Sequence, residues 1–296
     1  MLSSIINAGF AITGTWPMRT ELSNRPVSNG ANALASSIVL VCRKRPEDAP
    51  QISRTNFLKA LRRELFPALQ KLQESNIAPV DLAQSAIGPG MAVFSRYRRV
   101  LEANGAPMSV RDALRVINEQ LDLYFNEQSG ELDAASRFCV DFYTQNAYNV
   151  MKYGEAEVLA NAKSVPIPTM VSGGFLYAKG GIVRLLERDE LPETVSPNEK
   201  TVWLVAQGLT RAMETGGVEA CARIVAALHG SGAERAKELA YRLYTIAERK
   251  KWTNEAYAYN ALVSSWEDLQ SRADELRRPQ SEQMALDLPQ SDDSNA

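Results

Sequence analysis

The first 45 residues constrain the fold most, because they predict one short helix and two strands with nothing to cover them. Residues 1–8 form an apolar run of helical character that ends at a glycine. Residues 10–16 alternate like a strand that stops at Pro17, and residues 37–42 predict a second, stronger strand. One helix and two strands cannot cover both faces of a sheet. We therefore expect the rest of this sheet to come from elsewhere, and we expect that deleting residues 1–45 improves solubility.

Two segments of this region, NAGFAITGTWPMRTEL and NGANALASSIVLVCRKR, resemble the last motifs of a family of large adenine-specific DNA methyltransferases. These are bacterial and archaeal proteins, often encoded beside phage-defence genes, with an N-terminal domain of unknown function. The resemblance continues through NIAPVDLAQSAIGPGMAVFSRY and ELAYRLYTIAERKKWTNEAYAYNALVSSW and covers residues 1–267. It implies that the two strands are an antiparallel pair at one edge of the methyltransferase sheet. The activity it implies is methyl transfer from S-adenosylmethionine to adenine N6 in DNA.

The chemical motifs of that family are missing from this chain. The resemblance requires a Gly-rich turn for S-adenosylmethionine and an Asp/Asn-Pro-Pro-aromatic tetrad that holds the flipped adenine. No two prolines are adjacent in the sequence, and neither Gly88-Pro89-Gly90 nor Gly173-Gly174-Phe175 follows a strand and opens a helix. We therefore expect that this chain alone binds no cofactor and is inactive. S-adenosylmethionine would belong to the complete enzyme, with a partner that carries the catalytic motifs.

The composition excludes several other classes of protein. The formal net charge is −2 and the isoelectric point is about 5.7, which argues against a wholly basic nucleic-acid coat. Cys42, Cys139 and Cys221 are too far apart for a metal-ligand pattern, and their odd number fits a reducing cytoplasm. No apolar run reaches the ~18 residues that span a bilayer. We expect a cytoplasmic protein with no membrane partner.

The fold class we predict is mainly α. An N-terminal remnant of an α/β methyltransferase sheet (helix plus antiparallel strand pair) is followed by a helical region with a winged-helix-like unit. Pro67 predicts a kink or helix restart near Phe66, and Gly88-Pro89-Gly90 predicts a tight break between two helices. The predicted divisions are the terminal helix and strand pair (1–45), a linker (46–53), a helical region (54–132), the winged-helix-like unit (133–190), a helical bundle (198–267) and a disordered acidic tail (271–296).

The loop between the two N-terminal strands holds the first candidate DNA contacts. Arg19 and Arg25 are candidates for holding phosphates, Glu21 lies between them, and Asn32 either donates to a base or closes the turn. Beyond the loop, residues 43–64 contain seven Lys/Arg and three Asp/Glu. This excess is typical either of a phosphate-facing patch or of a solvated helix face.

A second group of candidates is Arg96, Arg98 and Arg99, which are interleaved with Tyr97. An aromatic ring among arginines suits stacking on bases or gripping phosphates. The alternative is that Tyr97 belongs to the core and that the arginines pair with acidic side chains.

Three helices and a two-stranded ribbon are predicted between residues 133 and 190, in the order of a winged helix. Asp133 can cap the first helix, and the second is apolar at Ala156, Val158, Leu159 and Ala162. The third helix and Lys163 would then enter a DNA groove while Lys179, at the ribbon tip, contacts a phosphate. Because the third helix is poor in residues that read base edges, the alternative is a packing or protein-contact module.

The polar tail contains a short apolar motif, Gln283-Met284-Ala285-Leu286-Asp287-Leu288. It resembles the bacterial peptide that binds the sliding clamp, in which apolar anchors enter a groove and the glutamine fixes the register. The candidate clamp-binding residues are Gln283, Met284, Leu286 and Leu288.

These features together predict a C-terminal fragment or split component of an adenine-N6 DNA methyltransferase. It would supply DNA recognition or assembly, with DNA and a catalytic methyltransferase subunit as partners. The alternative is a non-enzymatic DNA- or protein-interaction module in phage defence or at the replication clamp.

Overall fold

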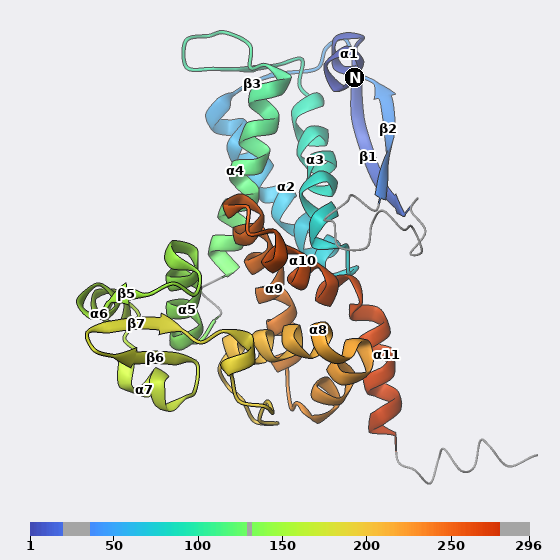
Figure 1. Cartoon of the computed structure of the whole chain (residues 1–296). Helices are drawn as coiled ribbons and strands as arrows, with labels where there is room; N and C mark the ends of the chain where they lie inside the picture. Colours follow the sequence, from blue (N-terminus) through green and yellow to red (C-terminus); the bar gives the residue numbers. More distant parts are fainter. Residues whose placement is uncertain (20–35, 129–131, 279–296) are drawn as a thin grey trace, which may run out of the picture.

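The computed structural model of the protein describes residues 1–19, 36–128 and 132–278. This part of the chain is mainly α-helical and contains three small sheets, so the predicted mainly α fold is confirmed. An N-terminal strand pair stands beside three helices, the winged-helix-like unit projects to the opposite side, and the last helices lie below them (Figure 1). No helix among the described residues is both long enough and apolar enough to cross a membrane.

The N-terminal part begins with the predicted helix and antiparallel strand pair. Strands β1 and β2 form a two-stranded sheet with an irregularity between Ile12 and Gly14. A second sheet pairs β3 with β4 in parallel, so the last three residues of the predicted linker are a strand. The elements are α1 (Leu2–Asn7), β1 (Phe10–Arg19), β2 (Ser36–Lys44), β3 (Gln51–Ser53), α2 (Arg54–Glu74), α3 (Pro79–Ser95), β4 (Arg99–Leu101) and α4 (Val110–Gln128).

The prediction that the first strand stops at Pro17 is wrong. Strand β1 continues to Arg19, and Pro17 pairs in register with Ile38 of β2. Among the described residues β1 has one neighbouring strand, and a proline is tolerated in such an edge strand because the ladder does not need its missing N–H.

Two predicted interruptions of helices are also wrong. Helix α3 runs unbroken through Gly88-Pro89-Gly90, and α2 runs unbroken through Pro67. A Cβ at Gly88 would overlap the side chain of Thr15 in β1, and a Cβ at Gly90 would come within 2.6 Å of Ile117 in α4. The two glycines therefore allow close packing of α3 against a strand and a helix, where the sequence suggested a turn.

The winged-helix-like unit has the predicted order of elements and one strand more. Its three-stranded sheet has the order β5-β7-β6, and the Gly180-Gly181 turn joins β6 to β7 with positive φ at both glycines. The Asp133 carboxylate accepts a hydrogen bond from the Ser136 N–H at 2.8 Å, as predicted for a cap. Val158, one of the apolar residues of the second helix, is 71% exposed. The elements are α5 (Ala134–Asn146), β5 (Met151–Lys152), α6 (Tyr153–Ala162), α7 (Ile167–Ser172), β6 (Leu176–Lys179), β7 (Ile182–Leu185) and the 3-10 turn η2 (Arg188–Glu190).

The last part of the chain is a bundle of helices, as predicted, but it extends beyond residue 267. Gly217 interrupts α8 with φ 62°, where the sequence predicted one helix to close. Helix α11 continues to Arg277 and buries Leu269 and Ala273, so the predicted disorder from residue 271 is wrong as far as Arg277. The elements are α8 (Val202–Ala227), α9 (Gly232–Lys250), α10 (Thr253–Ser264) and α11 (Trp266–Arg277).

Candidate nucleic-acid interface

A cleft of about 660 Å³ opens at the N-terminal end of the molecule, between α1, the end of α3, β4 and the start of α4. Its floor is apolar and its rim carries three arginines, Tyr97 and small polar side chains. No acidic residue is among those that line it. The lining residues are Ser3, Ile6, Asn7, Arg45, Phe94, Tyr97, Arg98, Arg99, Val100, Pro107, Met108, Ser109 and Val110.

Arg45 holds the walls of this cleft together. Its Nη1 donates to the backbone carbonyls of Ser95 at 3.2 Å and Tyr97 at 3.1 Å, and its Nη2 donates to the carbonyl of Ile6 at 3.4 Å. The Ser95 and Ile6 carbonyls lie in the last turns of α3 and α1, and the Tyr97 carbonyl lies two residues beyond α3. Arg45 is therefore a positioning residue that fixes α1, β2 and α3 to one another.

The structure separates the three predicted arginines into two roles. Arg96 pairs with Glu64 through two hydrogen bonds of 3.1 and 2.5 Å, and these bonds lower the pKa of the Glu64 carboxyl. Arg98 and Arg99 are exposed at the rim of the cleft and make no ion pair within the described residues. Tyr97 is half-buried between them and the cleft. Arg98 and Arg99 are thus available to an anionic ligand, whereas Arg96 is not.

The surroundings of the cleft carry an excess of positive charge that the whole chain lacks. Residues 36–115 contain 13 Lys/Arg and 7 Asp/Glu, against a net charge of −2 for the complete chain. A local excess of this kind attracts phosphates without making the protein basic overall.

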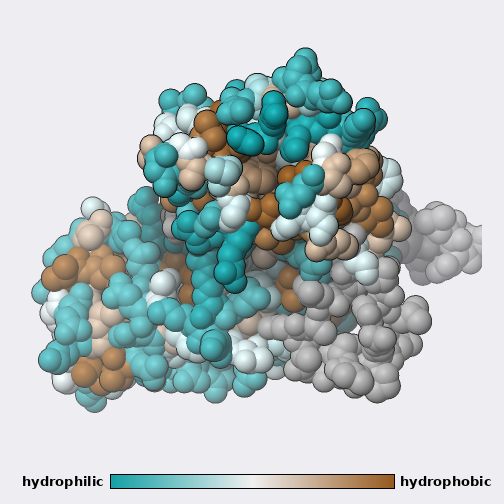
Figure 2. All heavy atoms as spheres, turned by 90° about the horizontal axis from the view of Figure 1, so that it is seen from above, coloured by the Kyte–Doolittle hydropathy of each residue, from teal (hydrophilic) through white to brown (hydrophobic). Residues whose placement is uncertain are grey.

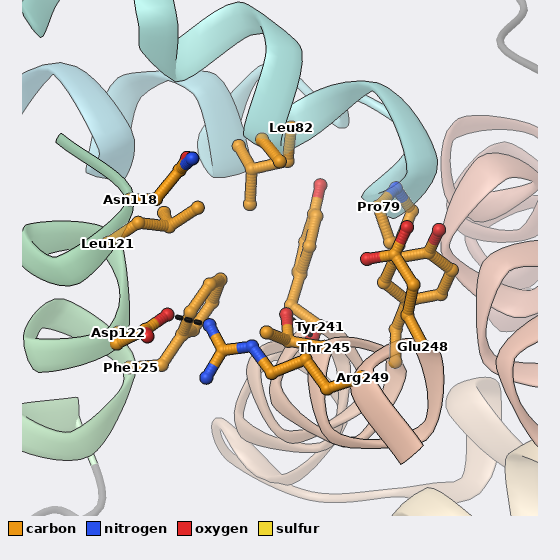
Figure 3. A pocket seen from close by; sticks show the side chains of 12 residues that line it. Pro79, Leu82, Asn118, Leu121, Asp122, Phe125, Tyr241, Thr245, Glu248 and Arg249 are labelled. Atoms are coloured by element: carbon orange, nitrogen blue, oxygen red, sulfur yellow. Dashed lines mark hydrogen bonds and ion pairs between the residues drawn. The ribbon is translucent and has the colours of Figure 1, made fainter. Parts of the chain in front are cut away.

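A second cavity, of about 300 Å³, lies between α3, α4 and α9 and is less suited to a polyanion. Figure 3 shows the Arg249 guanidinium pointing at Asp122, with which it forms an ion pair. Glu248 lies on the same rim, so acidic groups outnumber basic ones among the lining residues. This cavity marks the contact between the N-terminal helices and the final bundle.

The winged-helix-like unit presents a neutral surface where a DNA-reading helix would lie. Helix α7 contains no charged residue, and its Val171 is 39% exposed. Lys163 is paired with Asp141 at 2.7 Å, whereas Lys179 is exposed beside the hairpin turn. Residues 133–190 contain six Lys/Arg and seven Asp/Glu. Lys152 is also exposed, but the unit has no excess of positive charge with which to attract a phosphate backbone.

The strand pair β1–β2 is covered on one face only within the described residues. Thr15 faces α3, where Gly88 leaves room for it. Trp16 and Val39 pair across the strands on the other face and are 64% and 49% exposed, beside the exposed Met18 and Val41. Seen from above, hydrophobic residues gather on the side of the molecule where the strand pair lies (Figure 2). Within the described residues this face is therefore apolar and open.

Several predicted site residues lie outside the described residues. These are the loop residues Glu21, Arg25 and Asn32 and the clamp-motif residues Gln283, Met284, Leu286 and Leu288. Arg19 is the last described residue of β1, where the backbone pairs with Ser36.

The described residues do not fit S-adenosylmethionine. Gly88 and Gly90 lie inside α3 and are packed against other side chains, so their backbone is closed to a ligand. Gly173 and Gly174 lead from helix α7 into strand β6, which is the reverse of the strand-to-helix turn that binds such cofactors. No group of three or more potential metal-ligating side chains occurs in the described ranges.

A buried polar cluster that sequence reasoning missed joins the winged-helix-like unit to the final bundle. Arg188 donates to the Glu255 carboxylate at 2.7 Å and lies over the ring of Tyr259 at 5.1 Å. Burial raises the pKa of the surrounding tyrosines well above its usual range. The Glu255 oxygen that binds Arg188 also accepts hydrogen bonds from the hydroxyls of Tyr143 (2.9 Å), Tyr148 (3.2 Å) and Tyr259 (3.1 Å). These residues are separated by up to 112 positions, so no local pattern indicates the cluster.

The described residues form a mainly helical protein with a winged-helix-like unit and a half-covered strand pair. The chain belongs to the family described as Domain of unknown function (DUF8807), whose model matches residues 133–286, about half of its length. The match covers the winged-helix-like unit and helices α8 to α11, which the Arg188–Glu255 cluster connects to that unit. Comparison with curated proteins and with solved structures gave no match.

Proposed function

We propose that this chain is the DNA-recognition and assembly component of an S-adenosylmethionine-dependent adenine-N6 DNA methyltransferase. The cofactor and catalytic motifs would lie in a partner subunit, in the cytoplasm. The observation that carries the proposal is the strand pair β1–β2, which the described residues cover on one face and leave open on the other. Residues 1–45 also resemble the end of a methyltransferase sheet, and this resemblance suggests that the partner is a catalytic methyltransferase subunit.

The physical argument for assembly is that a two-stranded sheet with an open apolar face is incomplete. Helix α3 already supplies the covering element that a two-stranded sheet needs on one face, so the apolar side chains of the other face are what a partner would cover. Trp16 and Val39 would be covered when a partner adds a helix to the open face or a strand to a free edge. A catalytic α/β domain can offer both.

The argument for DNA contact rests on Arg98 and Arg99. Both are exposed, without ion-pair partners in the described part of the chain, and they stand at a cleft with an excess of positive charge around it. Guanidinium groups bind phosphates through two parallel hydrogen bonds. Arg19, Arg25, Asn32 and Lys179 remain candidate contacts.

The test is co-expression with the product of an adjacent reading frame that encodes a Pro-Pro-aromatic tetrad and a Gly-rich turn. We expect the two chains to co-purify and to methylate adenine together. Trp16→Asp with Val39→Asp should abolish co-purification, because charges on the open face cannot be buried without partners. Val158→Asp is the matched control, since Val158 is 71% exposed on α6.

Two results would contradict the proposal. One is retention of the catalytic chain by the Trp16→Asp, Val39→Asp variant at the level of the control. The other is tight binding of S-adenosylmethionine by the isolated chain in calorimetry.

A second candidate function is a non-enzymatic interaction module in phage defence or at the replication clamp. The observation that favours it is the uncharged, exposed surface of α7, which suits a protein partner. The clamp motif at 283–288 would provide one such contact, and changing Gln283 and Leu286 to Ala would then abolish clamp pull-down. A salt series separates the candidates, because phosphate contacts give DNA binding a steep dependence on salt concentration whereas a protein-only module gives none.

A further inference from the structure

The cleft at Arg98 and Arg99 has a feature that phosphate binding alone does not explain, namely its apolar floor. Ile6, Phe94, Val100 and Met108 line it and are 2–8% exposed, so they form its buried apolar base. A groove that binds only the DNA backbone needs positive charge and hydrogen-bond donors along its length. It does not need apolar residues at its bottom. The floor therefore indicates a ligand with an apolar or aromatic part.

The rim adds the complementary polar groups. Arg98 and Arg99 both line the cleft, and together their guanidinium groups carry up to ten N–H donors that a phosphate can accept from. Tyr97 offers a ring edge, and the exposed Asn7 at the end of α1 offers an amide that can donate and accept at once. The volume of about 660 Å³ is within the range of small-molecule sites.

From this combination we propose that the cleft binds one nucleoside monophosphate unit. The base lies on the floor formed by Phe94, Val100 and Met108, and the phosphate lies against Arg98 and Arg99. The unit comes either from a free nucleotide or from an unstacked nucleotide within a DNA strand. In the second case the inference deepens the proposed function, because the cleft would hold a nucleotide displaced from the duplex outside any catalytic pocket.

The structure offers a variant that fills the cleft without touching its arginines. Ser3 lines the cleft from α1 and is exposed, so Ser3→Trp places a large ring into the space for the base. Ser4 is its neighbour on the same helix, is also exposed and does not line the cleft, so Ser4→Trp is the matched control. The pair Arg98→Ala, Arg99→Ala removes the phosphate site.

The first experiment measures binding of dAMP to the full chain by calorimetry, with deoxyadenosine and inorganic phosphate as partial ligands. We expect dAMP to bind at least tenfold more tightly than either part. Ser3→Trp and the double arginine variant should each weaken dAMP at least tenfold, and Ser4→Trp should leave it unchanged. Phosphate binding as tight as that of dAMP, or no effect of Ser3→Trp, would overturn the proposal.

The second experiment identifies the source of the nucleotide. A DNA strand with 2-aminopurine opposite an abasic site gives a base that unstacks at low cost, and its fluorescence rises when it leaves the stack. A rise on binding that Ser3→Trp removes assigns the cleft to DNA, whereas dAMP binding without such a rise assigns it to free nucleotides. Binding of dAMP by a chain that binds neither DNA nor a catalytic subunit would contradict the proposed function alone. Binding of DNA without binding of dAMP or a fluorescence change would contradict this inference alone.

Discussion

The Nη2 of Arg188 donates to the Glu255 carboxylate at 2.7 Å, and this ion pair lies mostly buried between the winged-helix-like unit and the final helices. Their side chains are 13% and 18% exposed. Three tyrosine hydroxyls donate to the same carboxylate, so its charge is well satisfied in the folded protein. The cluster fixes the relative position of two units that the family model spans as one.

Removing the guanidinium should therefore destabilise the whole matched region. In Arg188→Met the Glu255 carboxylate stays buried without its cation, which costs about 3–5 kcal/mol of unfolding free energy by comparison with other buried pairs. Urea denaturation followed by far-UV circular dichroism measures this. The matched control is Arg223→Met, because the Arg223–Glu219 pair is 71% and 44% exposed and should contribute less than about 1 kcal/mol. Equal losses in the two variants would show that the buried pair has no special role.

The close approach of Gly88 to Thr15 predicts that a single methyl group uncouples the strand pair from α3. In Gly88→Ala the new Cβ overlaps the Thr15 side chain, and overpacking of this kind typically costs about 1–3 kcal/mol. Gly154→Ala is the control, because nothing lies within 4 Å of a Cβ there and alanine favours a helix. In a double-mutant cycle, Thr15→Gly should recover part of the loss from Gly88→Ala. Additive losses would contradict the contact.

The open face of the strand pair predicts how solubility can be improved, and the structure changes the expectation about deletion. Ile12 is 2% exposed and Arg45 bonds to three backbone carbonyls, so removing residues 1–45 would uncover the core beside α3. Replacing Trp16 and Val39 with Thr should instead reduce aggregation of the isolated chain while the unfolding temperature stays within a few degrees. Light scattering at increasing protein concentration measures the first effect. A deletion variant that is both more soluble and equally stable would refute this view.

Stability at low pH should depend on the Arg184–Glu190 pair. Hydrogen bonds from Arg184 lower the pKa of Glu190 to about 2. A carboxyl with a depressed pKa stabilises the fold above its unfolded pKa of about 4.3, and this contribution is lost as the pH falls toward 2. In Arg184→Gln the Glu190 titration should move back toward that unfolded value, which carbon NMR of the side chain can follow. A titration that stays near 2 in the variant would assign the shift to the backbone N–H of Glu187 instead.

What the sequence could predict is what depends on neighbours along the chain. The Asp133 cap and the hairpin turn at Gly180-Gly181 are local, because each is fixed by residues within about four positions. The predicted helix break at Gly88 is wrong because the sequence alone does not distinguish a glycine that ends a helix from one that allows close packing. The residue that packs against Gly88 is Thr15, 73 positions away in the sequence. The Arg188–Glu255 pair could not be predicted for the same reason, because its two residues are 67 positions apart in the sequence. At the candidate site, Arg98 and Arg99 were predicted from local composition, whereas the apolar floor comes from four segments and had no local signal.

The helix that replaces the predicted start of the tail gives the last prediction. Leu269 and Ala273 of α11 are fully buried, and Arg277 donates to the Val225 carbonyl at 2.6 Å, so α11 belongs to the folded bundle up to its end. A chain truncated after Arg278 should unfold at the same urea concentration as the full chain. Truncation after Leu269 should lower that midpoint, because it uncovers the α8 surface that α11 packs against. Leu269→Ala, which leaves the length unchanged, should cost about 2–5 kcal/mol through the cavity it creates. If the shorter truncation and Leu269→Ala both left the midpoint unchanged, the bundle would end near residue 267, as the sequence alone suggested.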